Sequence, residues 1–226
     1  MGDNIHSGDE RLSRLTQREY CSMAARYLPQ ARSYCEIGPD IGLFLEETRR
    51  HYPIEKAVLI EPNRNVWARL EQAASGIKSD IAPTAEAIAA IADGSVDLIV
   101  AIHVLDHLLI PSDTIQWVKR KLSPKGVAVF VVHDERSTLT KILGRRWPPY
   151  CLQHPQLYNA ATFRNTLSSM GLCVKDVLRT SNYFPLGYLI EHALYSATRK
   201  HYGLDWLKWP VRLKLGNIMA IATLTD

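Results

Sequence analysis

The chain alternates between short runs of strand-forming residues and stretches with helical periodicity. The strand-like runs are Ser33–Ile37, Lys56–Glu61, Val96–Ile102 and Val127–Val132. The last three of these are apolar almost throughout, as in strands that are buried on both faces of a sheet. The helical stretches are residues 16–28, 42–51, 63–74 and 112–122, and the last is followed by a predicted turn at 123–126. This alternation predicts an α/β domain with a mostly parallel sheet covered on both sides.

The alternation of predicted helices and strands continues after residue 160, but one long segment interrupts it. A helix is predicted at 161–170, and strands are predicted near 172–178 and 217–224. The segment between these two strands is too long for a simple connection, and apolar residues recur in it at helical spacing from Leu186 to Lys200. We therefore expect residues 1–226 to form a single domain. It would have an N-terminal helical segment within residues 1–30 and a helical insertion at 183–212 before the last strand.

The first predicted strand runs into a turn that contains two glycines. Its sequence is Glu36-Ile37-Gly38-Pro39-Asp40-Ile41-Gly42-Leu43. A glycine turn between a strand and a helix lets a ligand approach the backbone where the first helical amides point outward. A dinucleotide fingerprint would need glycine at positions 40 and 43, and it fails at both. A different pattern, an acid followed by G-x-G-x-G, is matched at Glu36, Gly38 and Gly42. The sequence departs from this pattern only at Asp40.

A second acid, Glu61, ends the next predicted strand, 19 residues after Gly42. A carboxylate at that place can accept two hydrogen bonds from a ribose diol. The competing interpretation is an ordinary surface acid at the end of a strand.

Taken in order, these blocks resemble the class I S-adenosylmethionine-dependent methyltransferase superfamily. The blocks are EIGPDIGLF, VLIEPN, DGSVDLIVAIHVLDHL and LSPKGVAVFVVHD. The stretch from His154 through FRNTLSSMGL to Val177 is similar to the C-terminal half of small-molecule methyltransferases of the quinone and polysaccharide type. The resemblance covers about residues 30–180 and implies a Rossmann-like, seven-stranded sheet that binds S-adenosylmethionine.

The resemblance also assigns residues to the cofactor. It implies that Glu36, Gly38, Asp40 and Gly42 border the methionine end of the cofactor, and that Glu61, followed by Pro62, holds the ribose. It further implies that Thr84 and Ala85 lie beside the adenine and that His103 lies near the cofactor. Asp40 is the departure, because the family usually has glycine there and a side chain could crowd the cofactor or weaken its binding.

Histidines at the ends of two strands are the candidate catalytic groups. Methyl transfer to a hydroxyl requires alignment of the reactants and removal of a proton, and histidine titrates near neutrality. His103 follows the strand at 96–102 and His133 follows the strand at 127–132. We predict His133 and His154 as catalytic bases, while His107 and Tyr158 are further candidates; a purely structural role stays open for each.

One alternative motif is a metal site. His103-Val104-Leu105-Asp106-His107 has the H-x-x-acid-H spacing of an inverted zinc protease site. That site needs a continuous helix, whereas His103 follows an apolar strand. The four cysteines form no C-x-x-C pair, so we predict no metal and no disulfide framework, and we expect a cytoplasmic location.

Charge is distributed unevenly along the chain. The formal net charge is +4, but residues 141–226 contain 11 Lys or Arg and only 4 Asp or Glu. This basic excess favours an anionic or lipid-linked acceptor, or is simply a solvated face. The insertion, which includes Trp206 and Trp209, is interpreted either as a lid over the acceptor or as a surface in peripheral contact with a membrane. No apolar run is long enough to span a bilayer.

The leading hypothesis is S-adenosylmethionine-dependent methylation of a hydroxyl on a small molecule or a glycan precursor. Two alternatives stay open, namely a catalytically silent methyltransferase-like binding domain and an NAD(P)-dependent oxidoreductase. A nucleic-acid substrate is disfavoured because Ala101-Ile102-His103-Val104 replaces the amino-methylating tetrapeptide at the end of its strand.

Overall fold

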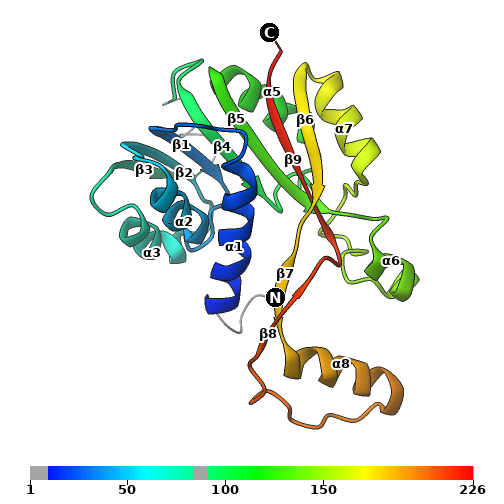
Figure 1. The fold of residues 1–226 in the computed structure, drawn as a ribbon. Helices are drawn as coiled ribbons and strands as arrows, with labels where there is room; N and C mark the ends of the chain where they lie inside the picture. Colours follow the sequence, from blue (N-terminus) through cyan, green and yellow to red (C-terminus); the bar gives the residue numbers. More distant parts are fainter. Residues whose placement is uncertain (1–9, 84–90, 226) are drawn as a thin grey trace.

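The computed structural model describes residues 10–83 and 91–225 of the chain. Its main sheet has seven strands in the order β3-β2-β1-β4-β5-β9-β6 (Figure 1). The strands are β1 (Ser33–Ile37), β2 (Lys56–Ile60), β3 (Lys78–Ala82), β4 (Val96–Ile102), β5 (Leu122–His133), β6 (Leu172–Arg179) and β9 (Asn217–Leu224). Strands β1 to β5 pair in parallel, and β9 runs antiparallel between β5 and β6. The predicted Rossmann-like, mostly parallel, seven-stranded sheet is confirmed.

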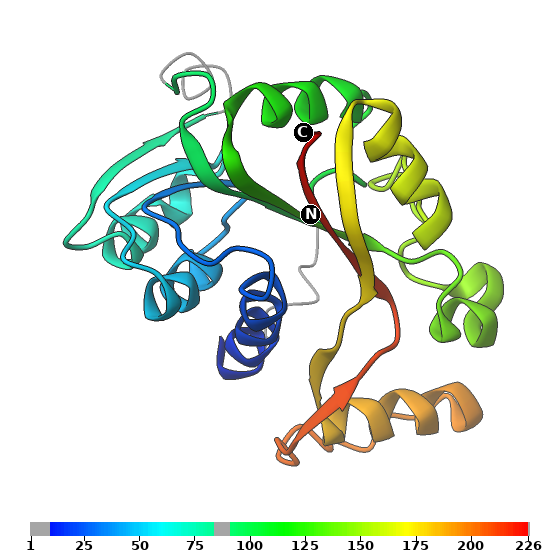
Figure 2. The same ribbon diagram turned by 45° about the horizontal axis from the view of Figure 1, so that its top comes forward.

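Helices cover both faces of this sheet (Figures 1 and 2). One face carries α1 (Glu10–Ala24), α2 (Leu43–His51) and α3 (Trp67–Ala73), and the other carries α5 (Pro111–Lys121) and α7 (Ala160–Ser169). Successive side chains of a strand point to opposite faces. In β5, Val129 and Val131 therefore pack under α1, α2 and α3, whereas Ala128 and Phe130 pack under α5 and α7. This explains why the central strands are apolar at every position.

Most predicted elements lie within a few residues of their observed bounds, but the predicted turn at 123–126 is wrong. Residues 122–133 form one continuous strand that begins directly after α5. Gly126 allows this path, because a Cβ added there would lie 2.8 Å from both the Val96 carbonyl oxygen and the Leu122 Cδ1. Pro124 is tolerated in the exposed first part of the strand, where the pairing between Val96 and Leu98 is irregular.

The insertion is more elaborate than a helical cap. It contains β7 (Asn182–Pro185), α8 (Leu186–Thr198) and β8 (Pro210–Leu213), and β7 and β8 form a separate two-stranded antiparallel sheet. We call residues 182–213 the arm. In Figures 1 and 2 the arm extends away from the carboxyl ends of the parallel strands, close to the start of α1.

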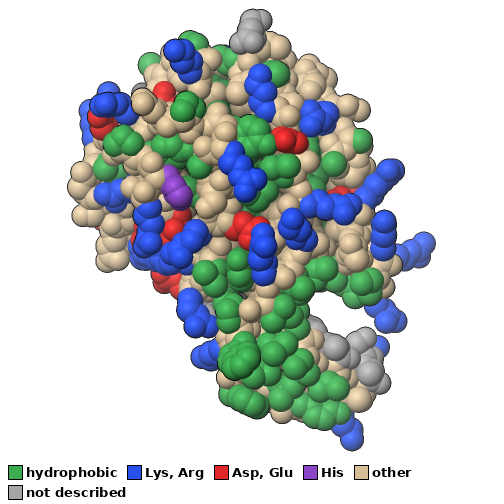
Figure 3. Space-filling model, in the orientation of Figure 1, with side chains coloured by type: hydrophobic (Ala, Val, Ile, Leu, Met, Phe, Trp, Pro, Cys, Tyr) green, Lys and Arg blue, Asp and Glu red, His purple; other side chains and the backbone are tan. Residues whose placement is uncertain are grey.

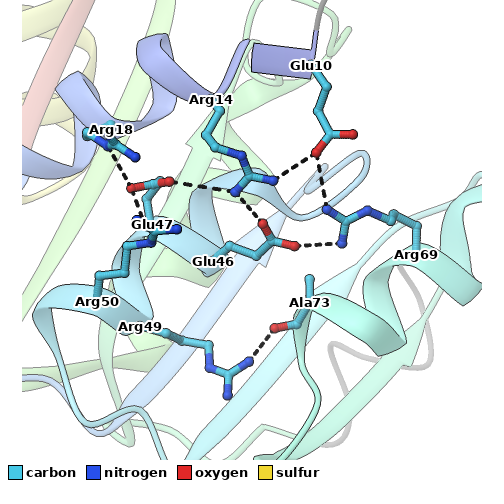
Figure 4. A network of polar contacts seen from close by, with 9 residues as sticks. All are labelled: Glu10, Arg14, Arg18, Glu46, Glu47, Arg49, Arg50, Arg69 and Ala73. Atoms are coloured by element: carbon cyan, nitrogen blue, oxygen red, sulfur yellow. Dashed lines mark hydrogen bonds and ion pairs between the residues drawn. The ribbon is translucent and has the colours of Figure 1, made fainter. Parts of the chain in front are cut away.

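An ion-pair network fixes α1 to α2 and α3 (Figure 4). Arg14 of α1 contacts both Glu46 and Glu47 of α2, and Glu46 also accepts from Arg69 of α3 at 2.6 Å. The Glu47 side chain is only 1% exposed and is also approached by Arg18 at 3.1 Å. A buried carboxylate needs such partners, since an unpaired buried charge is strongly destabilising. The network therefore keeps α1 against the glycine loop, where it forms one wall of the site.

Candidate functional site

A cavity of about 660 Å³ opens at the carboxyl ends of β1 and β4. One side is formed by the glycine loop after β1, with Glu36, Gly38 and Asp40, together with His103 after β4. The opposite side is formed by α1 and by the root of the arm. The residues on that side include Thr16, Gln17, Tyr20, Asn182, Tyr183, Phe184 and Tyr188. A volume of this size suits a cofactor or a drug-sized ligand.

The glycine loop adopts left-handed backbone conformations at three positions. Gly38, Asp40 and Gly42 have φ values of 70°, 50° and 78°. Gly42 precedes the first residue of α2, and a Cβ added to it would lie 2.8 Å from the Ala73 Cβ. Asp40 takes the left-handed conformation that glycine would take in the family pattern, and short polar residues tolerate it better than most others. The loop thus keeps the expected shape in spite of the substitution.

Alanine at Gly42 is expected to lower the free energy of unfolding by about 2–4 kcal/mol, through backbone strain together with the clash against α3. Gly94 provides a matched comparison, because its φ is also positive, at 66°, but a Cβ there would meet nothing within 4 Å. Gly94→Ala should therefore cost only about 1 kcal/mol. Urea unfolding measures both variants, and equal losses would show that the contact between loop and helix contributes nothing.

Glu61, directly after β2, is held in place by the loop itself. Its Oε2 accepts from the Asp40 backbone amide at 3.1 Å, and its Oε1 accepts from the Asn63 amide at 2.7 Å. Burial raises the pKa of this carboxyl, and the two backbone amides oppose the shift. Glu61 is buried and lies next to the cavity-lining loop, outside the lining itself. Its remaining oxygen lone pairs are the groups available to a diol.

Glu36 is the cavity-lining acid whose pKa is shifted most from its ordinary value. It is 2% exposed and accepts a hydrogen bond from the Tyr34 hydroxyl. Burial raises its pKa to about 8, the nearby Asp40 and Glu61 add to the rise, and the Tyr34 hydroxyl opposes it. A cation bound beside Glu36 would favour its ionised form.

The raised pKa of Glu36 predicts a specific pH dependence of stability. Between about pH 4.5 and the folded pKa of about 8, the folded state binds more protons than the unfolded state, so stability falls as the pH rises. Glu36→Gln removes this contribution while keeping an acceptor for Tyr34. We expect the variant to match the wild type near pH 5 and to be more stable near pH 9, with a difference that grows by at most about 1.4 kcal/mol per pH unit. Urea unfolding of both proteins across this pH range tests the prediction. A difference in stability between them that does not change with pH would contradict it.

Beyond the glycine loop, Asp106 joins two histidines at the ends of β4 and β5. Its carboxylate is fully buried, and its Oδ2 lies 2.5 Å from the His133 Nδ1 and 3.7 Å from the His103 Nδ1. The contacts with the two histidines hold the pKa of Asp106 well below its usual range, against the effect of burial. Burial lowers the pKa of His133, so its imidazole is neutral near pH 7. With its Nδ1–H donated to Asp106, His133 carries its basic lone pair on Nε2.

His103 connects this pair to the cavity wall formed by α1 and the arm root. It has a left-handed backbone, with φ 52°, and its Nε2 lies 3.2 Å from the Asn217 Nδ2, which donates to it. Asn217 also donates to the Tyr20 hydroxyl at 3.2 Å, and that hydroxyl donates to the Asn182 Oδ1 at 2.7 Å. Residues from α1, β7 and β9, together with His103 directly after β4, therefore meet in one polar network at the cavity wall.

Asp106, His103 and His133 have ligand atoms within 4.8 Å of one another, a spacing that a metal ion could use. Two ligands of one tetrahedral zinc ion lie roughly 3.4 Å apart, whereas the His133–Asp106 contact is 2.5 Å. That distance fits a charge-assisted hydrogen bond. Residues 103–108 form a bend and a turn, so the helix required by the inverted zinc protease motif is not formed there.

The structure brings some of the predicted site residues together and separates others. Glu36, Gly38, Asp40 and His103 line the cavity, whereas Gly42 and Glu61 support the loop from outside the lining, and Pro62 is exposed. His133 and His154 are also outside the lining. The His133 ring centroid is 4.5 Å from that of His103 and 4.7 Å from that of His154. Thr84 and Ala85 lie outside the described residues, so their predicted contact with adenine stays a prediction.

Several site residues are not predicted from the sequence. Tyr20, Asn182 and Asn217 are far apart along the chain and carry no motif, so only the fold brings them together. In the sequence Asp106 stands out only as part of the zinc spacing, although an acid three residues after a strand-end histidine is a usable signal for a histidine–carboxylate pair.

Comparison with known proteins is consistent with this geometry. A family model described as "Methyltransferase domain" matches residues 6–176. No curated protein matches the sequence. Solved structures with the same fold include a SAM-dependent methyltransferase from Archaeoglobus fulgidus (16% identity, 94% of this chain and 96% of that one, TM-score 0.61). Another is a SAM-dependent methyltransferase from Aquifex aeolicus (12% identity, 94% and 93%, TM-score 0.60).

A third similar structure is a chain from the complex between the Trm112 methyltransferase activator of Haloferax volcanii and a methyltransferase (13% identity, 96% and 95%, TM-score 0.66). At these identities the similarity establishes the fold, while the family match covers most of the chain. The family match favours methyl transfer over the oxidoreductase alternative.

The residues of the cavity also suit the cofactor that this family implies. S-adenosylmethionine carries a sulfonium and an ammonium cation. The cavity is lined, in the described part of the chain, by the acids Glu10, Glu36 and Asp40 and by no Lys or Arg. Gly38 leaves the backbone open at the end of β1, and Glu61 presents its carboxylate next to the loop. The chain belongs to the methyltransferase domain family, and it is an S-adenosylmethionine-dependent methyltransferase.

Proposed function

We propose that this methyltransferase acts on a hydroxyl group of a small molecule or a glycan precursor. The observation that carries the proposal is the His133–Asp106 pair next to His103, at the end of the sheet where the cavity opens. A hydroxyl must lose its proton when it is methylated, and a neutral histidine held by a buried carboxylate is suited to accept it.

The acceptor side of the cavity supports a polar, uncharged acceptor. Thr16, Gln17 and Asn182 offer hydroxyl and amide groups there, and Phe184 and Tyr188 add aromatic rings that are stacked with their centroids 6.2 Å apart. Gln17 Oε1 is buried and has no hydrogen-bond partner within the described part of the chain. A sugar or a polyhydroxylated ring can donate to such an acceptor while packing on the aromatic rings. Because no Lys or Arg is among the described lining residues, an anionic group on the acceptor would have to lie outside the cavity.

The division of tasks in the proposed reaction follows from this arrangement. When bound, S-adenosylmethionine supplies a methyl group on a positively charged sulfur. His133 Nε2 would accept the hydroxyl proton from an acceptor oxygen that reaches past His103, which lines the cavity and whose ring centroid lies 4.5 Å from that of His133. The acceptor oxygen would gain the methyl group, and the bonding electron pair would remain on sulfur. Asp106 stabilises the imidazolium that results.

A screen of acceptors with isotopically labelled S-adenosylmethionine tests the proposal. The panel contains sugars, sugar nucleotides and phenols, together with amines, RNA and a protein extract, and mass spectrometry identifies the methylated atom. We expect label on an oxygen of a small acceptor. Transfer only to nitrogen, RNA or protein would contradict the proposal.

A further inference from the structure

The arm exposes large aromatic side chains outside the cavity. Trp206 and Trp209 are 72% and 73% exposed, and Tyr202 is 48% exposed. None of the three is among the described residues that line the cavity, which is reached only by the arm root around β7 and Tyr188. Figure 3 shows apolar side chains gathered over much of the face of the arm that is in view. These aromatic residues therefore belong to a surface that is separate from the acceptor site.

The helix of the arm adds to this surface. α8 has the sequence LGYLIEHALYSAT, which contains no Lys or Arg and a single acid, Glu191. Its described apolar residues Leu186, Leu189, Ile190 and Leu194 are each only partly buried. In a helix that packs on the core of a globular protein, leucine and isoleucine side chains are normally buried against a neighbouring element. An exposed apolar area of this kind marks a contact surface.

Cations border the exposed aromatics. Arg199, Lys200 and Lys208 are exposed, and Arg199 lies over the ring of Tyr195 at 5.8 Å. The acids within the arm are Glu191 and Asp205. Glu191 accepts from the backbone amides of Tyr202 and Leu204, which ties it to the turn after α8. The arm is thus apolar and basic at the same time.

We propose that the arm docks on the surface of an anionic phospholipid bilayer. Tryptophan and tyrosine place their rings at the boundary between head groups and acyl chains, while neighbouring Lys and Arg contact the anionic head groups. The basic charge of the arm matches such a surface, whereas the acidic cavity does not, so the two sites bind partners of opposite charge. None of the helices in the described ranges has the length and apolar composition to cross a membrane.

Vesicle sedimentation tests this inference with the full-length protein. We expect the protein to bind phosphatidylcholine vesicles that contain roughly one-third phosphatidylglycerol, and to bind pure phosphatidylcholine vesicles far more weakly. Trp206→Ala combined with Trp209→Ala should reduce the partition coefficient at least about tenfold, because two aromatic side chains no longer leave water. Lys208→Glu should reduce it at least about fivefold.

Lys125→Glu is the matched control for charge. Lys125 is also an exposed lysine, but it lies near the start of β5, at the end of the sheet opposite the arm. This variant should bind vesicles like the wild type, and an equal loss of binding in both lysine variants would overturn the docking geometry.

Absence of binding to anionic vesicles would overturn the inference, as would a dimer in sedimentation equilibrium that the tryptophan substitutions dissociate. Binding of S-adenosylmethionine should be the same in all these variants, so failure here is distinct from failure of the proposed function.

Discussion

Replacement of His133 by alanine is expected to lower kcat for hydroxyl methylation by about 10²–10⁴-fold, the usual contribution of a general base. The affinity for S-adenosylmethionine should not change, because His133 is outside the cavity lining and contacts Asp106 and the neighbouring rings. Single-turnover kinetics with the acceptor identified by the screen, together with calorimetry, separates the two effects.

Two further variants sharpen the test of His133. Asp106→Asn should also lower kcat, and it should shift the acidic limb of the pH–rate profile, because the carboxylate no longer stabilises the imidazolium. A purely structural role for Asp106 would leave that limb in place. His51→Ala replaces an exposed histidine at the end of α2 and should leave the rate unchanged. A normal kcat in His133→Ala would show that another group, with His103 or His154 as the first to examine, accepts the proton.

Replacement of Glu61 by alanine is expected to raise the Kd for S-adenosylmethionine by about 5- to 150-fold, which corresponds to about 1–3 kcal/mol of charge-assisted hydrogen bonding. The effect combines two causes. The variant removes the carboxylate proposed to hold the ribose, and it also removes the acceptor that fixes the Asp40 amide within the glycine loop. Calorimetry measures the change in Kd.

Glu55→Gln is the control for Glu61. Glu55 is an exposed acid that immediately precedes β2, whereas Glu61 immediately follows the same strand at its carboxyl end. We expect Glu55→Gln to bind the cofactor with the wild-type affinity. A Glu61→Ala protein that stays folded and binds with unchanged affinity would mean that the ribose is held elsewhere.

The structure is most predictable from the sequence where periodicity and strand-end chemistry coincide. The observed bounds of β4 and β9 are those predicted, because continuous apolar runs have few alternatives to a buried strand. Glu36, Gly38 and Gly42 can be located because a ligand loop requires glycine conformations at fixed spacing. Gly38 and Gly42 both have positive φ values, which such a loop conformation requires, and their contact with a cofactor stays a prediction.

Long-range features cannot be predicted in this way. The pairing of β7 with β8 joins segments separated by α8, and both strands are only four residues long, so neither has a clear pattern of its own. The predicted turn at 123–126 is wrong because Pro and Gly also occur in irregular strands, where close packing and not chain reversal requires them. The network of Tyr20, Asn182 and Asn217 depends on side chains from three distant elements, and local rules do not connect them.

Asp40 is the main sequence feature that argues against cofactor binding. In the structure its amide supports Glu61, and its backbone follows the left-handed path of the loop. The substitution therefore preserves the loop, and it adds one more acidic side chain to the wall of the cavity.

Isothermal titration of the wild-type protein with S-adenosylmethionine, with NAD(P) as the comparison ligand, is the decisive test of the cofactor. We predict saturable binding of S-adenosylmethionine at one site, weakened in Glu61→Ala and unchanged in Glu55→Gln, with no binding of NAD(P). Failure to bind S-adenosylmethionine at millimolar concentration, or preferential binding of NAD(P), would contradict the assignment of this chain as a methyltransferase.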